Sequence, residues 1–196
     1  MNMEKSATFA GLSEAQIVTL NERYAALDFS ERLHQLYEDF APEKVMVTSS
    51  FAATSAYFLH IVSTIRPEQI IHFIDTGYHF PETIEYRKYL IDLFKLNVED
   101  IRAEDWKHQF TQTEQTYLKD PDLPIFEIRR GMIKFNPMID VSREARDAYI
   151  REHDLPFHPL VAKGYSSIGC THCTVQGEGR SGRWLGKPKT ECGLHL

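Results

Sequence analysis

Hydrophobic and polar positions along the chain follow two periods, which predicts helices alternating with short buried strands. Amphipathic or apolar helical spacing is found at about 13–26, 30–40, 53–65, 81–96, 104–118 and 142–153. Strands are indicated at 44–48, 70–74, 97–102, 125–128 and 132–135. Ser13, Ser30 and Ser142 are expected N-caps, and Pro81 opens a helix. The order of elements predicts an α/β fold with a Rossmann-like parallel sheet flanked by helices.

Charge is unevenly distributed between the body and the end of the chain. The net charge is −6, but residues 161–196 carry five Lys or Arg against two acids. An acidic body with a basic tail suggests a local site for a small anion rather than a nucleic-acid-binding face, but on charge alone a solvated, mildly basic tail is the favoured reading. The apolar runs are too short for a membrane span, and no secretory signal is visible at the N-terminus. We therefore expect a cytoplasmic protein; three cysteines do not suggest a disulfide framework.

Two predicted strand ends carry polar residues that suit a nucleotide. The first is in "VMVTSSFAATSAYFLH", where Ser49, Ser50 and Phe51 lie in a strand–turn–helix whose backbone N–H groups can bind an anion. The second is the turn Asp75-Thr76-Gly77. Ligands of open parallel sheets bind beyond the carboxyl ends of strands. A plain strand–helix connection is an equal reading of the first loop alone, but the two loops together form a coherent nucleotide pocket.

The composition changes after residue 154, where Gly, Pro, Ser and charges replace periodic patterning. We expect residues 1–160 to form the nucleotide-binding α/β domain with its N-terminal helices. Residues 161–196 are expected to form a mobile C-terminal tail, which wraps over the body or orders when a ligand binds. This tail contains all three cysteines.

Cys170 and Cys173 form a CxxC in a Gly/Ser loop. The first interpretation is half of a metal or iron–sulfur site, the second a pair of structural thiols, and the third a redox dithiol. Cys192 is different, because cations flank it: Arg180, Arg183, Lys187, Lys189 and His195. Cations favour a nucleophilic thiolate and can clamp an anionic substrate beside it. A frayed tail holding an unimportant thiol is the competing reading.

Together these stretches resemble the phosphoadenylyl-sulfate/adenylyl-sulfate reductase family, the thioredoxin-dependent sulfonucleotide reductases. "TSSFAATSAYFLH" is similar to the family's modified pyrophosphate-binding loop, and "HFIDTGYHFPET" to its Asp-Thr-Gly loop. The stretches "GYSSIGCTHCT", "GEGRSGRW" and "KTECGLH" match its C-terminal signatures in order. The resemblance covers nearly the whole chain from about residue 30. It implies the adenine nucleotide alpha-hydrolase-like form of the Rossmann-like fold.

The resemblance implies reduction of adenylyl sulfate, or its 3′-phospho form, to sulfite in sulfate assimilation and cysteine biosynthesis. Cys192 would attack the sulfur and form an S-sulfocysteine, which thioredoxin or glutaredoxin would reduce. Ser49, Ser50, Phe51 and Asp75-Thr76-Gly77 would hold the adenosine end. Arg180, Arg183 and His195 would contact the phosphosulfate. The CxxC favours adenylyl sulfate, while "TSSF" is closer to the 3′-phospho branch; a homo-oligomer is left open.

The sequence lacks some of the cysteines that bind the cofactor in members of the family that it resembles. Members with a CxxC normally add an upstream Cys-Cys pair, and four thiolates then hold a [4Fe–4S] cluster. Here Cys170 and Cys173 have no such pair, and Leu123 runs directly into Pro124 where the family carries it. Ala52 replaces a more common Gly. Two alternatives therefore stand beside the reductase: an ATP-pyrophosphatase-type nucleotidyl transferase and a catalytically degenerate nucleotide-binding protein.

Overall fold

The computed structural model describes residues 12–102, 124–129 and 132–184, which group into two compact units. Of the described residues, 12–39, 124–129 and 132–141 form one unit, and 40–102 and 142–184 form the other. The boundary that the sequence predicts at residue 160 is not tested by this grouping and stays a prediction. Among the described helices, none has the length and apolar character that crossing a membrane requires.

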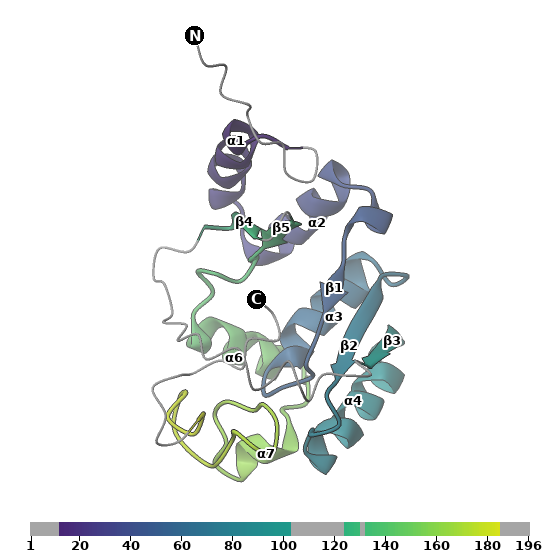
Figure 1. The fold of residues 1–196 in the computed structure, drawn as a ribbon, viewed down its shortest axis with the longest axis vertical. Coiled ribbons are helices and arrows are strands. Elements are labelled where there is room, and N and C mark those ends of the chain that lie inside the picture. Colours follow the sequence, from purple (N-terminus) through teal and green to yellow (C-terminus); the bar gives the residue numbers. More distant parts are fainter. Residues whose placement is uncertain (1–11, 103–123, 130–131, 185–196) are drawn as a thin grey trace. The chain divides into compact units, whose positions relative to one another are not determined.

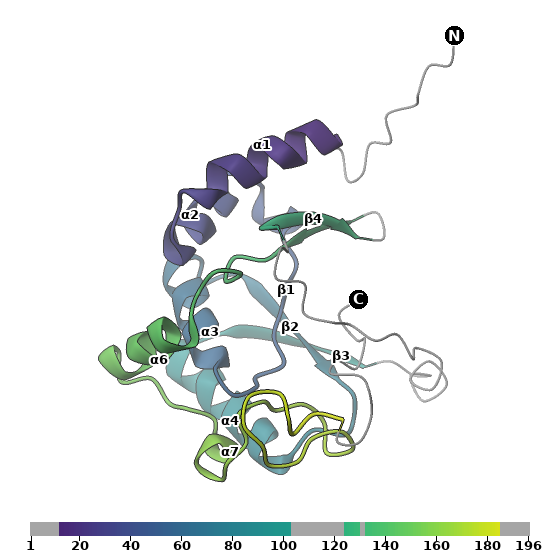
Figure 2. The same cartoon turned by 90° about the vertical axis from the view of Figure 1, so that its left-hand side faces the viewer.

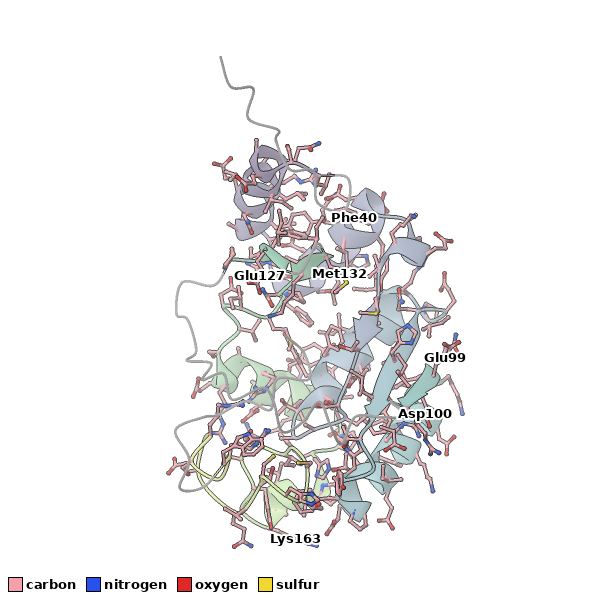
Figure 3. The ribbon with its side chains drawn as sticks, viewed as in Figure 1. Phe40, Glu99, Asp100, Glu127, Met132 and Lys163 are labelled. Carbon is pink, nitrogen blue, oxygen red and sulfur yellow. The ribbon has the colours of Figure 1, made fainter. Side chains whose placement is uncertain are left out.

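The smaller unit contains two helices and a hairpin: α1 (Glu14–Ala25), α2 (Phe29–Asp39), β4 (Phe126–Arg129) and β5 (Met132–Phe135). The hairpin is antiparallel, with Glu127 opposite Lys134; Glu127 and Met132 are labelled in Figure 3. The core is aromatic, since Tyr24 is fully buried and meets Phe126 edge-on at 4.7 Å. The amide of Asn21 bonds both the N–H and the carbonyl of Phe126, at 2.7 and 2.9 Å. These bonds fix α1 on the hairpin.

Helix caps in this unit confirm one prediction and correct another. Ser13 caps α1 and forms a reciprocal capping box with Gln16. Ser30 does not cap α2, because the helix already begins at Phe29. Asp28 takes that role: its carboxylate accepts from the Glu31 N–H at 2.8 Å, and the Glu31 carboxylate accepts from the Asp28 N–H at 2.8 Å. Asp is as good a cap as Ser, and Glu at the third helical position completes the box.

The larger unit contains the three-stranded parallel sheet that the sequence predicts. Its strands lie in the order β1 (Val47–Thr48), β2 (Ile70–Asp75) and β3 (Asn97–Arg102). The crossover helices α3 (Ser55–Ile65) and α4 (Pro81–Phe94) lie on one face of it, as Figure 2 shows. The α/β fold with a parallel sheet and flanking helices is confirmed. The first strand is shorter than predicted, because a 3₁₀ turn (Pro42–Lys44) occupies its expected start.

Residues 142–184, which begin with α6 (Arg143–Glu152), also belong to the larger unit. Ser142 caps α6 as predicted, accepting from the Ala145 N–H at 3.0 Å. A short helix that the sequence analysis missed, α7 (Pro159–Ala162), follows, and it begins with Pro like α4. Lys163 (Figure 3) ends it and pairs with Glu82 of α4 at 2.8 Å. Of the predicted tail, residues 161–184 have defined positions; residues 185–196 lie outside the described residues, as does the predicted helix at 104–118.

Candidate functional site

All three strands are parallel, so their carboxyl ends meet at one edge of the sheet. Thr48, Asp75 and Arg102 are the last residues of these strands. The two loops singled out from the sequence continue from the first two of them (Figure 1). The sheet therefore brings the Ser49–Phe51 and Asp75–Gly77 segments to the same edge, as predicted.

The first loop is held by its own serine. The Ser49 N–H donates to the His72 carbonyl of β2 at 3.1 Å, and the Ser49 hydroxyl accepts from the Phe51 N–H at 3.2 Å. Ser49 is buried and Ser50 is exposed. Phe51 has a φ of 49°, and its ring is fully buried against Phe73, 5.7 Å away. The Phe51 ring thus belongs to the core and its N–H is bonded within the loop, so the exposed Ser50 is the residue of this loop most open to a ligand.

The second loop is an Asx turn around Asp75. One carboxylate oxygen of Asp75 accepts from the Gly77 N–H at 2.9 Å. The other accepts from the Arg102 Nε at 3.1 Å. Gly77 has a φ of 71°, a left-handed conformation that glycine adopts without strain. Thr76 is buried, and its hydroxyl accepts from the Tyr78 N–H at 3.4 Å.

Two residues at this edge were missed by the sequence analysis. Arg102 ends β3 directly opposite Asp75 in the parallel register. The His79 ring contacts the Phe73 ring at a tilt of 36°, with centroids 4.6 Å apart, and its Nε2 lies 3.1 Å from the Ile74 carbonyl. Arg102 could have been found from the sequence, because it ends the predicted strand that follows the strand of Asp75. For His79 the sequence offers no such signal, because its ring contact depends on the fold.

The CxxC turn lies directly on the second loop. Thr171 donates to the Tyr78 carbonyl through its N–H at 2.8 Å and its hydroxyl at 3.2 Å. His79 and Cys170 form an antiparallel bridge, and the His172 ring meets the Tyr78 ring edge-on at 4.1 Å. The predicted Asp75-Thr76-Gly77 loop and the predicted thiol loop are thus parts of one region, which the sequence alone did not connect.

The two thiols of this turn are in contact. The Sγ atoms of Cys170 and Cys173 lie 3.2 Å apart. The hydrogen bond from Cys170 lowers the pKa of Cys173, and the guanidinium of Arg183 and the Thr174 hydroxyl act in the same direction against burial. The pKa of Cys170 is raised, because its thiol donates that bond and is itself partly buried.

The arginines of the Arg-x-x-Arg motif differ in environment. Arg180 is exposed, whereas Arg183 is only 9% exposed. The Nη2 of Arg183 lies 3.9 Å from the Cys173 sulfur, and its Nη1 lies 3.4 Å from the Ser167 hydroxyl. Cys192 and His195 fall outside the described residues, so the grouping of Arg180 and Arg183 with them stays a prediction.

The thiols do not fit the cluster that the CxxC suggested. A [4Fe–4S] cluster is held by four thiolates, and the whole chain has three cysteines. Within the described ranges, no three His, Cys, Asp or Glu side chains converge on a common point as metal ligands would. No chemical step is therefore assigned to an iron–sulfur group in this protein.

Known proteins place the chain in a family. The model of the phosphoadenosine phosphosulfate reductase domain matches residues 44–121 and 111–176. An adenosine 5′-phosphosulfate reductase of Chelativorans sp. is 34% identical, over 94% of this chain and 92% of that protein. A phosphoadenosine 5′-phosphosulfate reductase of Thiocapsa roseopersicina is 33% identical, over 93% of this chain and 94% of its own.

A solved structure confirms the fold. The phosphoadenylyl-sulfate reductase of Candida auris, in a phosphate complex, superposes with a TM-score of 0.70 at 22% identity, over 84% of this chain and 98% of that one. The two alignments with bacterial relatives extend over 226 and 227 positions, more than the 196 residues here. Those relatives therefore contain positions with no counterpart in this sequence. From the family model and the identities over nearly the full length, the chain belongs to the phosphoadenosine phosphosulfate reductase domain family.

Proposed function

We propose that this protein is an oxidoreductase that reduces a sulfonucleotide to sulfite in sulfate assimilation. The substrate is adenylyl sulfate or its 3′-phospho form, and the nucleotide product is AMP or its 3′-phospho form accordingly. The observation that carries the proposal is the meeting of the Ser49–Phe51 and Asp75–Gly77 loops at the carboxyl edge of the parallel sheet, in a chain of this family. Relatives named for adenosine 5′-phosphosulfate and relatives named for phosphoadenosine 5′-phosphosulfate are nearly equally identical to this chain. Both nucleotides are therefore included in the test.

The two loops divide the adenosine end between them. Ser49 can donate through its hydroxyl and Ser50 through its hydroxyl and N–H, while Phe51 offers its backbone carbonyl, since its N–H donates to Ser49 and its ring is buried. The Asp75 carboxylate, steadied by Gly77 and Arg102, faces a ribose or base edge that can donate to it. Arg180 and Arg183, with His195, neutralise the phosphosulfate. For Arg183 this contact requires its side chain to leave Cys173.

The reaction has two stages. The Cys192 thiolate attacks the sulfur of the sulfonucleotide, the bond from sulfur to the phosphate oxygen breaks, and the nucleotide leaves with that oxygen. The enzyme then carries an S-sulfocysteine. A thiolate of thioredoxin or glutaredoxin attacks the Cys192 sulfur and expels sulfite. The second thiol of that reductant resolves the mixed disulfide, which returns Cys192 and leaves the reductant oxidised.

Intact-mass measurement on the full chain tests the covalent stage. Incubation with adenylyl sulfate, and separately with its 3′-phospho form, is expected to add about 80 Da, the mass of SO₃. Cys192→Ser is expected to abolish both the adduct and sulfite release in the presence of thioredoxin. Cys170→Ser is the matched control and is expected to retain the adduct. The absence of an adduct with either nucleotide would contradict the proposal.

A second candidate is a nucleotide-binding protein without turnover. It is favoured by the positions that the bacterial relatives have and this chain lacks. Binding of adenylyl sulfate by calorimetry, with neither adduct nor sulfite, would support this candidate against the reductase. The nucleotidyl-transferase alternative gains no support, because the Ser49–Ala53 loop lacks the Ser-Gly-Gly-x-Asp-Ser pattern of those enzymes.

A further inference from the structure

The CxxC brings its two sulfurs into contact, and among the described residues no set of metal ligands surrounds them. The Cys173 N–H donates to the Cys170 carbonyl at 3.2 Å, so the motif is one closed turn. The Sγ atoms are 3.2 Å apart. A disulfide bond is about 2.05 Å long, so a small movement of the two side chains closes it. Four thiolates are not available in a chain of three cysteines.

A buried cation accompanies the pair. The guanidinium of Arg183 lies 3.9 Å from the Cys173 sulfur, and its Nε is buried with no hydrogen-bond acceptor. No carboxylate in the part of the chain that the structure describes forms an ion pair with it. A buried charge is costly unless an anion is paired with it, and the Cys173 thiol beside Arg183 is a group that can become one.

The backbone is shaped for this contact. Arg183 lies across Gly169, where a Cβ atom would come within 2.5 Å of Nη2 and 2.6 Å of Cζ. Thr174 bridges back to Arg183 in an antiparallel pair, and the Trp184 N–H donates to the Cys173 carbonyl at 2.8 Å. The arginine is therefore held beside the thiol by main-chain bonds on both sides of the turn.

We propose that Cys170 and Cys173 form a redox-active dithiol, which closes to an intramolecular disulfide by exchange with a small-molecule disulfide such as glutathione disulfide. This activity is separate from the attack by Cys192 proposed above. It goes beyond the cluster interpretation of the CxxC, which the thiol count does not support.

The accessibility of the two sulfurs assigns their roles. Cys170 is partly exposed, whereas Cys173 is 5% exposed. Cys170 passes its proton to the hydrogen-bonded Cys173 sulfur as it attacks glutathione disulfide, which releases one glutathione thiolate and forms a mixed disulfide; the released thiolate then takes that proton from Cys173. The Cys173 thiolate, paired with Arg183, attacks the Cys170 sulfur and releases the second glutathione. Two protein thiols are oxidised and one external disulfide is reduced to two thiols.

A redox titration of the full chain tests the proposal. The protein is equilibrated without oxygen in glutathione buffers, quenched with acid, labelled with N-ethylmaleimide and digested with trypsin. Cleavage after Lys163 and Arg180 places both thiols in one peptide, and cleavage after Lys189 places Cys192 in another. The doubly labelled 164–180 peptide is expected to give way, in one step, to an unlabelled peptide about 2 Da lighter than the dithiol. A peptide that stays doubly labelled in glutathione disulfide, or ends as a glutathione adduct, overturns the proposal.

Variants separate this couple from the proposed reductase. Cys192→Ser is expected to leave the titration of the 164–180 peptide unchanged while abolishing the S-sulfo adduct, so the two proposals fail independently. Cys170→Ser is expected to yield no disulfide in that peptide. Iron, zinc and sulfide are measured on the same anaerobic protein. One equivalent of metal that protects both thiols from labelling would also overturn the proposal.

The contact between Arg183 and the Cys173 thiolate is tested by the midpoint of the glutathione titration. Arg183→Gln removes the charge that stabilises the reduced form, so the disulfide is expected to form at a several-fold lower ratio of oxidised to reduced glutathione. Ser167→Ala, which removes the neutral partner of Arg183, is the matched control and is expected to titrate like the unaltered chain. An Arg183→Gln midpoint equal to that of the control contradicts the pairing of Arg183 with the thiolate.

Discussion

Thr171 donates two hydrogen bonds to the carbonyl of Tyr78, one from its N–H and one from its hydroxyl. This pair of bonds joins the thiol turn to the loop that begins at Asp75. A ligand that binds the Asp75–Gly77 segment therefore binds a loop that the CxxC turn holds in place at Tyr78. The tail motifs have a structural role at the candidate nucleotide site in addition to any chemistry.

Thr171→Val tests this connection. The substitution keeps the shape and the N–H bond but removes the hydroxyl bond to Tyr78. One such bond contributes about 1 kcal/mol, so we expect the Kd for adenylyl sulfate, measured by calorimetry, to rise roughly 3- to 10-fold. Thr64→Val, which removes a hydroxyl bond to the His60 carbonyl within α3, is the control and should leave the Kd unchanged. Equal Kd values for both variants would show that the hydroxyl bond of Thr171 does not contribute to nucleotide binding.

Asp75 is expected to bind nucleotide through a carboxylate that two partners orient. Asp75→Asn keeps an acceptor for the Gly77 N–H but loses the ion pair with Arg102, whereas Asp75→Ala loses both. We expect the Kd for adenylyl sulfate to rise in both, and by about tenfold or more in Asp75→Ala. Asp92→Asn, at an exposed position of α4, serves as the control. The idea fails if Asp75→Ala binds as tightly as Asp92→Asn.

The order of helices and strands was predictable because local hydrophobic periods determine it. The Asp75 turn was predictable for the same reason, since Asp followed two residues later by Gly defines it locally. Contacts between distant segments were not. The pairing of Asp75 with Arg102 follows from strand register, and the docking of Thr171 on Tyr78 joins residues 93 positions apart. The choice between Asp28 and Ser30 as the cap of α2 was missed because both residue types cap well.

His158 gives the larger unit a specific dependence on pH. It is 1% exposed, accepts from the Leu160 N–H at 3.1 Å and lies 3.0 Å from the Thr83 hydroxyl. Burial lowers its pKa from 6.5 to about 4. Between pH 6.5 and 4, His158 is protonated in the unfolded chain but neutral in the folded one. The free energy of unfolding that His158 contributes is therefore complete above pH 6.5 and is lost as the pH falls toward 4.

The His158 contribution is measured by urea unfolding between pH 4.5 and 7. The pKa difference corresponds to roughly 3 kcal/mol across the full window. His158→Gln removes the titrating group, so its unfolding free energy should change less with pH than that of the unaltered chain, although it is lower at pH 7. Parallel pH profiles for the two proteins would show that His158 is not the group responsible.

Arg32 is expected to stabilise the smaller unit through its carboxylate partner. It is 1% exposed and holds both oxygens of Asp140, at 2.6 and 2.7 Å, and it also donates to the Tyr24 and Pro137 carbonyls. Its hydrogen bonds lower the pKa of Asp140. Asp140→Asn leaves the buried guanidinium without its counter-charge, and we expect a loss of about 2 kcal/mol in urea unfolding.

Asp147→Asn is the matched control for this prediction. Asp147 pairs with Arg143 and Arg146 on α6, at 3.9 and 3.3 Å, and Arg143 is half exposed. Such partly exposed pairs contribute under about 1 kcal/mol and weaken in salt. The Asp140 effect should persist in 0.5 M sodium chloride, about five times the ionic strength at which the screening length is near 10 Å. If both substitutions cost the same and both effects vanish in salt, Arg32 and Asp140 interact no more strongly than a surface pair, although the Arg32 side chain is buried and only that of Asp140 is exposed, at 60%.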